Sequence, residues 1–166
     1  MSRLRKWLLA LAGLVCLGAA PVAANTAPAQ PGDDTSGRIQ RGEASFYHQR
    51  FHGQRMANGS RFDARSNSAA SRTLPLGTVA RVTNLATGQS AQVRIEDRGP
   101  RARHRIIDVS PRTATQLGMR RSGTARVEVA PIAVPQRDGS IRRHAPARPA
   151  PARPAPARPA PGRPAR

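Results

Sequence analysis

The stretch AQVRIEDRGPRARHRIIDVSPRTATQLG, residues 91–118, decides the fold class because it contains two strand patterns, a turn and a helix start. Ala91, Val93 and Ile95 alternate with polar residues, so they share one face of a short strand over residues 91–97. An Arg-Gly-Pro sequence ends this strand. The pattern is typical of a protein built from short strands and tight turns.

A second strand and a helix follow in the same stretch. Residues 105–109 form another short apolar run. Ser110 is a typical helix cap, Pro111 suits the first helical position, and Gly118 suits the end of the helix. The sequence therefore predicts one short helix directly after this strand.

Two further strands are predicted on either side. Residues 79–85 form a hairpin with residues 91–97 through a turn at Thr87 and Gly88, and residues 123–132 form the last strand. Several short strands and one helix in about 90 residues predict a closed or nearly closed barrel, which leaves few exposed edges.

The chain divides into four expected segments. They are a signal peptide at residues 1–24, a flexible linker at 25–40, a barrel domain at 41–132 and a disordered, basic Pro/Ala/Arg-rich repeat tail at 133–166. The linker is rich in Pro, Gly, Asp, Ser and Thr without apolar periodicity, and the repeated APARP unit of the tail has no large apolar side chain to form a core.

The N-terminus predicts export to the periplasm or cell envelope. Basic residues up to Lys6 precede an apolar run at residues 7–20 and a small-residue site ending at Ala24. Cys16 could mark a lipoprotein, but Val15 before it is a poor match to such a site. If Cys16 leaves with the signal peptide, the mature chain has no cysteine and needs no disulfide.

The charge predicts an anionic partner. The chain has 28 basic residues, all but Lys6 arginine, against 9 acidic ones. Nucleic acid is not expected, because the chain is exported and has only three Phe, one Tyr and one Trp for stacking on bases. Two interpretations of the extended, cationic tail stay open: contact with anionic envelope polymers, or a solvated segment without a specific partner.

Five segments together resemble the RlpA (rare lipoprotein A) family. They are GEASFYHQRFHGQRMANGSRFD (42–63), TLPLGTVARVTNLATG (73–88), VRIEDRGP (93–100), RIIDVSPRTATQLG (105–118) and GTARVEV (123–129). The resemblance implies a mainly β fold, a six-stranded double-psi β-barrel with one short helix. It also implies an endolytic peptidoglycan transglycosylase, a lyase that cleaves glycan strands without water and leaves anhydro-muramyl ends. No cofactor is implied, and a monomer is expected.

Asp97 is the candidate catalytic residue. Glycosidic cleavage needs a group that protonates the leaving oxygen, and one carboxyl can act as acid and then as base when the nucleophile is the sugar's own hydroxyl. The resemblance places the catalytic aspartate at the DRGP position. Apolar strand neighbours favour the neutral acid, whereas Arg98 favours the carboxylate. A structural role, in which Asp97 caps the turn or pairs with arginine, is the alternative.

The other candidates are polar residues expected to contact substrate. They are Tyr47, His52, Asn58, Ser60, Asp63, Ser71 and Arg98. Phe46 is a further groove candidate, His52 could instead pack beside Phe51, and Asp63 and Asp108 could serve the barrel structurally. The histidines show no metal-ligand spacing, so no metal is expected.

Two positions depart from the family pattern. Ser60 stands where the family usually has Glu, and Ser71 stands where it usually has His. A hydroxyl without an adjacent base is a poor proton-transfer group. The alternatives are therefore cleavage by Asp97 alone, a weakened or inactive glycan-binding module for wall remodelling, or a cationic adhesive protein acting through its tail.

Overall fold

The computed structural model describes residues 28–145. The expected signal peptide and the repeats from residue 146 onward lie outside the described residues. In chain order the elements are β1 (Gln40–Phe46), the 3-10 helix η1 (Gln49–Phe51), β2 (Ser68–Ser71), β3 (Val79–Asn84), β4 (Ser90–Asp97), β5 (Arg105–Val109), α1 (Pro111–Gln116), β6 (Thr124–Pro135) and β7 (Ile141–Arg143).

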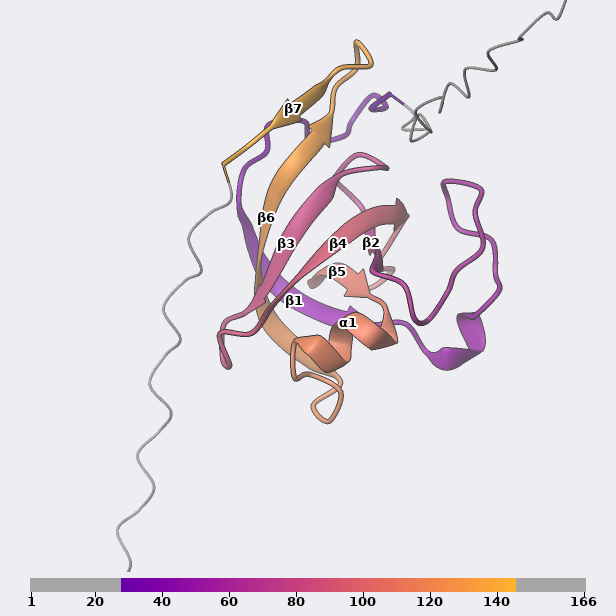
Figure 1. Cartoon of the computed structure of the whole chain (residues 1–166), viewed down its shortest axis with the longest axis vertical. Coiled ribbons are helices and arrows are strands. Elements are labelled where there is room, and N and C mark those ends of the chain that lie inside the picture. Colours follow the sequence, from indigo (N-terminus) through magenta and orange to yellow (C-terminus); the bar gives the residue numbers. More distant parts are fainter. Residues whose placement is uncertain (1–27, 146–166) are drawn as a thin grey trace, which may run out of the picture.

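Six strands close into a barrel, which confirms the expected fold class (Figure 1). The order is β1-β5-β2-β4-β3-β6, and β6 pairs back onto β1. β1 with β5 and β2 with β4 are parallel pairs, and the other pairs are antiparallel. The expected hairpin is the antiparallel β3–β4 pair. Closure leaves few unpaired strand edges, as expected for a barrel.

The barrel interior is filled by small and branched apolar side chains. Val93 and Ile95 of β4 are fully buried, as their alternation predicts. The other buried members include Ala44, Ala69, Leu74, Ala80, Val82, Ile107, Val109, Ala114, Leu117, Met119, Val127 and Val129. Gly42 of β1 is needed for close packing, because a Cβ there would lie 2.7 Å from Cγ2 of Ile106.

The helix begins as predicted. The Ser110 hydroxyl accepts from the backbone N–H of Thr113 at 3.2 Å, and it donates to the carbonyl of Ser66 at 2.6 Å. Pro111 occupies the first turn. The cap therefore satisfies one free N–H of the helix and ties α1 to the loop before β2.

The structure differs from the expected domain limits at both ends of the barrel. Residues 29–39, here called the N-terminal strap, were expected to be flexible linker. Instead the backbone N–H of Ala29 donates to Gln136 at 3.2 Å and that of Asp34 donates to Thr73 at 2.7 Å. The strap is held by backbone hydrogen bonds to distant segments, which composition does not reveal.

The C-terminal end of the folded domain also lies beyond its expected position at residue 132. β6 continues to Pro135, and β7 lies in the segment expected to be disordered. β7 pairs with β6 outside the closed ring, with Ala133 opposite Arg143. The three residues of β7 are all exposed, so main-chain pairing rather than apolar burial holds them. None of the helices between residues 28 and 145 is long and apolar enough to cross a membrane.

Candidate functional site

Asp97 is the last residue of β4, where its half-buried carboxylate is held by three donors. Oδ2 accepts from the Tyr47 hydroxyl at 2.8 Å. Oδ1 accepts from the backbone N–H of Ala57 at 2.9 Å and of Arg98 at 2.9 Å. The bond from Arg98 is the turn contact that the structural alternative predicts. The carboxylate is thus oriented by two separate segments while it keeps some exposure.

Tyr47 links Asp97 to a second apolar cluster under the loop after β1. Its ring lies 5.9 Å from that of Phe51 and 4.6 Å from that of Phe62, beside buried Met56. Burial raises the pKa of the Tyr47 hydroxyl far above its usual value, and the bond to Asp97 adds to the effect. Tyr47 is therefore a protonated donor engaged with Asp97, in place of the expected free contact with sugar.

A tight hairpin brings Asn58 and Ser60 to the same end of β4. The backbone N–H of Asn58 donates to the Glu96 carbonyl at 3.1 Å, next to the bond between Ala57 and Asp97. The Asn58 side-chain oxygen accepts from the Ser60 N–H and hydroxyl at 2.9 and 2.8 Å. Both residues are exposed, so their position fits the expected contact with a ligand near Asp97.

His52 and Asp63 lie together beside a hollow that Asp97 does not line. They border a hollow of about 360 Å³ with Gln49, Ala64 and Arg65. His52 Nδ1 is 3.6 Å from Asp63 Oδ1, and their side chains are 58% and 54% exposed. The exposure argues against the packed alternative for His52. In the described part of the chain, Asp97 lines neither this hollow nor the one beside the strap.

Ser71 does not fit the expected contact with substrate. It is 1% exposed in β2, between β4 and β5. Its hydroxyl oxygen accepts from the backbone N–H groups of Thr73 at 3.3 Å and Leu74 at 3.1 Å. The side chain stabilises the turn after β2, because it gives both backbone N–H groups a hydrogen-bond acceptor.

Arg98 was also expected to contact substrate, and the structure gives its guanidinium other partners. Nη1 donates to the carbonyls of Leu74 at 2.6 Å and Ser71 at 3.3 Å. Nη2 pairs with Asp33 Oδ1 at 2.8 Å. The charge of Arg98 is thus compensated within the protein, and its side chain holds the strap to the barrel.

Two other residues considered from sequence have structural contacts. The Asp108 carboxylate on β5 accepts from the Ser45 hydroxyl on β1 and lies 3.8 Å from the Arg105 guanidinium. It thus joins the parallel strands β1 and β5. Phe46 is half-buried, with the Arg120 guanidinium 5.1 Å from its ring centre.

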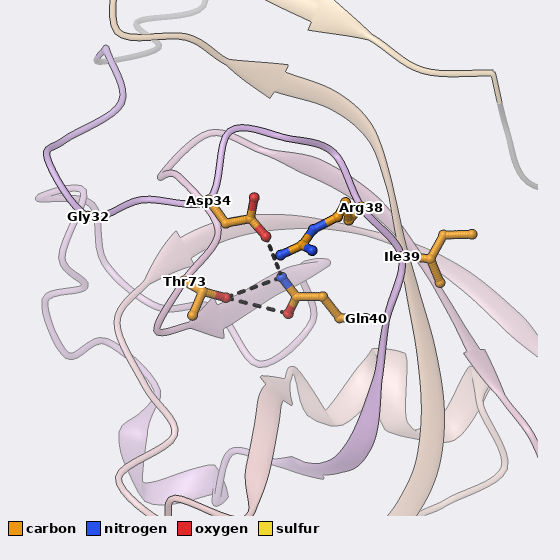
Figure 2. Close-up of a pocket in the computed structure, with 6 residues that line it drawn as sticks. All are labelled: Gly32, Asp34, Arg38, Ile39, Gln40 and Thr73. Carbon is orange, nitrogen blue, oxygen red and sulfur yellow. Dashed lines mark hydrogen bonds between the residues drawn. The ribbon is translucent and has the colours of Figure 1, made fainter.

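The strap forms a hollow that the sequence did not indicate, because this segment was expected to be linker. Its volume is about 470 Å³, and its lining residues are Gly32, Asp34, Arg38, Ile39, Gln40 and Thr73 (Figure 2). The Gln40 side-chain amide donates to Asp34 at 3.4 Å and Thr73 at 3.3 Å. The hydrogen bond from Ser36 lowers the pKa of Asp34.

No three His, Cys, Asp or Glu side chains between residues 28 and 145 come together as a metal site. The chemistry available at the end of β4 is therefore that of a half-buried carboxylate, Asp97, next to a protonated phenol and two backbone donors.

Comparison with known proteins defines the class. A family model described as "Lytic transglycolase" matches residues 39–129, which is more than half of the chain. The chain belongs to this family. The matched region contains β1 to β5 and the first part of β6, which continues beyond residue 129 to Pro135. It includes Asp97 and Tyr47.

Curated relatives are similar over the same region. The chain is 51% identical over 90 residues to the probable endolytic peptidoglycan transglycosylase RlpA of Synechocystis, covering 54% of this chain and 28% of that protein. It is 50% identical over 91 residues to the endolytic peptidoglycan transglycosylase RlpA of Pseudomonas aeruginosa, covering 55% and 27%. The match thus spans under a third of either relative.

A comparison of solved structures finds the Streptomyces papain inhibitor, with a TM-score of 0.47 and 21% identity, covering 57% of this chain and 94% of that one.

Proposed function

We propose that this chain is an endolytic lytic transglycosylase that cleaves peptidoglycan glycan strands, with Asp97 as the proton-transfer group. The observation that carries the proposal is the placement of Asp97 within the matched lytic transglycolase region, at a strand end, where Tyr47 and two backbone N–H groups orient it. Fixed orientation of a reacting group supplies a large part of enzymatic rate enhancement.

The proposed reaction needs one carboxyl. Protonated Asp97 donates its proton to the glycosidic oxygen as the bond from that oxygen to the anomeric carbon breaks. The resulting carboxylate then takes the proton from the hydroxyl of the same sugar as its oxygen bonds to the anomeric carbon. Asp97 ends protonated, no water is consumed, and an anhydro end forms.

The surroundings of Asp97 suit the half of this cycle in which it is a carboxylate. Tyr47 and the N–H groups of Ala57 and Arg98 donate to the carboxylate, so they stabilise it after the first proton has left. Ser60 and Ser71 supply no second proton-transfer group, because Ser60 is bonded to Asn58 and Ser71 is buried in β2. The proposal therefore assigns both proton transfers to Asp97.

Digestion of glycan tests the proposal. Residues 25–166 are incubated with purified sacculi and with glycan strands lacking stem peptides, and anhydro-muramyl ends are measured by mass spectrometry. We expect product from the wild type and none from Asp97→Asn. Asp138→Asn, on the exposed turn between β6 and β7, is the matched control and should retain activity.

If the wild type gives no more product than Asp97→Asn, the cleavage proposal is wrong. Sedimentation with sacculi then separates the remaining functions: binding without turnover is the result expected of a glycan-binding module.

The proposal extends to location and partners. We propose that the chain is exported through residues 1–24 and works as a monomer in the periplasm or cell envelope, where peptidoglycan is found. The arginine-rich repeats would add contacts with anionic envelope polymers. The composition of the two ends supports this part of the proposal.

A further inference from the structure

The N-terminal strap reaches the residue next to Asp97 through a largely buried ion pair. Asp33 Oδ1 lies 2.8 Å from Arg98 Nη2, and the two side chains are 7% and 30% exposed. The other carboxylate oxygen of Asp33 accepts from the backbone N–H of Gln30 at 2.9 Å. Both oxygens are thus engaged, as burial of a carboxylate requires.

Arg98 ties three segments together at the end of β4. Its guanidinium bonds to the strap through Asp33 and to the carbonyls of Ser71 and Leu74, while its backbone N–H donates to Asp97 Oδ1 at 2.9 Å. The side chain therefore fixes the position of the same residue whose backbone orients the candidate catalytic carboxylate.

We propose that Asp33 is a positioning residue for Asp97. By neutralising and holding the Arg98 guanidinium, Asp33 fixes the backbone of Arg98, which in turn fixes Oδ1 of Asp97. Asp33 has no direct bond to Asp97, so it acts through Arg98. For activity the inference rests on the proposed function. It makes the strap, which begins before the matched family region at residue 39, a part of the site.

Loss of the Asp33 carboxylate should alter the geometry around Asp97 for an electrostatic reason. A guanidinium left with two carbonyl partners gains hydration by turning outward, since a partly buried charge without its counter-ion is unfavourable. Arg98 would then release Ser71 and Leu74, and the end of β4 would become mobile. Oδ1 of Asp97 would lose the fixed geometry of one of its two backbone donors.

Asp34 is a matched control on the same strap. Its carboxylate bonds to Ser36 and Gln40, and Figure 2 shows it facing Gln40 beside the hollow. Asp34→Asn removes one negative charge from the neighbouring position without touching the Arg98 contact. A general effect of strap charge would appear in both variants, whereas positioning through Arg98 would appear in Asp33→Asn alone.

The experiment uses two readouts on wild type, Asp33→Asn and Asp34→Asn, each in the chain of residues 25–166. The first is the ¹H–¹⁵N amide signals of Ala57 and Arg98, the two backbone donors to Asp97 Oδ1. The second is kcat and KM for release of anhydro ends from glycan. We expect Asp33→Asn to shift both amide signals and to lower kcat by about tenfold or more, with KM within about twofold. Asp34→Asn should change neither readout.

Unchanged amide signals and kcat in a folded Asp33→Asn would overturn the inference. If that variant does not fold, Asp33→Glu is assayed in its place, because its longer side chain displaces the carboxylate from the 2.8 Å contact with Arg98. Shifted amide signals with a lowered kcat are expected, and wild-type values for both would overturn the inference. A wild type without cleavage would count against the proposed function only, because the amide signals test the positioning by themselves.

Discussion

The Tyr47 hydroxyl donates to Oδ2 of Asp97 at 2.8 Å, which joins the loop after β1 to the end of β4. The same tyrosine ring packs on Phe51 and Phe62. A single side chain thus couples the packing of the small apolar cluster to the geometry of the candidate catalytic carboxylate. Changes in that cluster should therefore alter activity as well as stability.

Tyr47→Phe removes the hydroxyl and keeps the ring, so it measures the contribution of the hydroxyl alone. We expect the free energy of unfolding to fall by about 1–2 kcal/mol, because a half-buried carboxylate oxygen loses a donor. Cleavage of glycan should fall about tenfold or more, because Asp97 loses one of its three orienting bonds. Urea denaturation and release of anhydro ends measure the two effects.

Tyr47→Ala is the comparison, since it removes the ring as well. We expect it to lower the free energy of unfolding by about 3 kcal/mol, the low end of the range for loss of an aromatic ring, because Tyr47 is only partly buried. Equal stability of the two variants would show that the ring contacts with Phe51 and Phe62 contribute nothing.

Tyr47 is the one tyrosine of the chain, so its ionisation can be followed directly by absorbance near 295 nm. Burial and Asp97 raise its pKa, and we expect no tyrosinate in the native protein at pH 10–11, whereas the urea-unfolded chain should titrate near pH 10. Above about pH 10 the unfolded state loses a proton that the native state keeps, so stability should fall as pH rises. Native titration near pH 10 would contradict the buried bond to Asp97.

Ser60→Glu tests whether an ionisable group at the hairpin tip increases cleavage. Ser60 is exposed, and its carbonyl accepts from the backbone N–H of Met56, the residue before Ala57, so a carboxylate fits there without displacing core residues. We expect kcat to rise, by about tenfold on the scale of general acid–base catalysis. A rate equal to wild type would show that Asp97 alone sets the rate; Ser122→Glu, on an exposed loop, is the control.

Ser71→His should fail to restore function, for a steric reason. Ser71 is 1% exposed between two paired strands, and its hydroxyl serves two backbone donors. We expect an imidazole there to lower the free energy of unfolding by about 1–3 kcal/mol or more, as overpacking does. Urea denaturation checks this, and a variant as stable as wild type with increased cleavage would show that β2 can open to admit the larger side chain.

Residues 146–166 should act through the charge of their arginines. Removal of residues 146–166 should leave the melting temperature unchanged and weaken binding to an anionic envelope polymer such as lipopolysaccharide at low salt. The difference between full-length and shortened chains should shrink as salt rises, because exposed arginines act through screened charge. Binding that is equal at all salt concentrations would contradict a role for the tail.

The sequence by itself determined the strands that alternate and the capped helix. Residues 79–85, 91–97 and 105–109 agree with β3, β4 and β5 to within a residue, and Ser110 caps α1 as predicted. These features depend on side-chain periodicity and on local backbone preference, both of which a short stretch of sequence carries. The position of Asp97 at the end of a strand followed from the same pattern.

The tertiary structure alone decided what each polar side chain does. β2 has the sequence SAAS, whose burial is set by the strands on its two sides, and β7 and the strap are held by backbone bonds to distant residues. Ser71 and Arg98 were expected to contact a ligand, and the structure shows bonds from the Ser71 hydroxyl to the turn after β2 and from the Arg98 guanidinium to Asp33. The bonds of Arg98, β7 and the strap join residues far apart in the chain, so neither composition nor spacing can specify them. The bonds of Ser71 are local, but its burial between β4 and β5 depends on closure of the barrel.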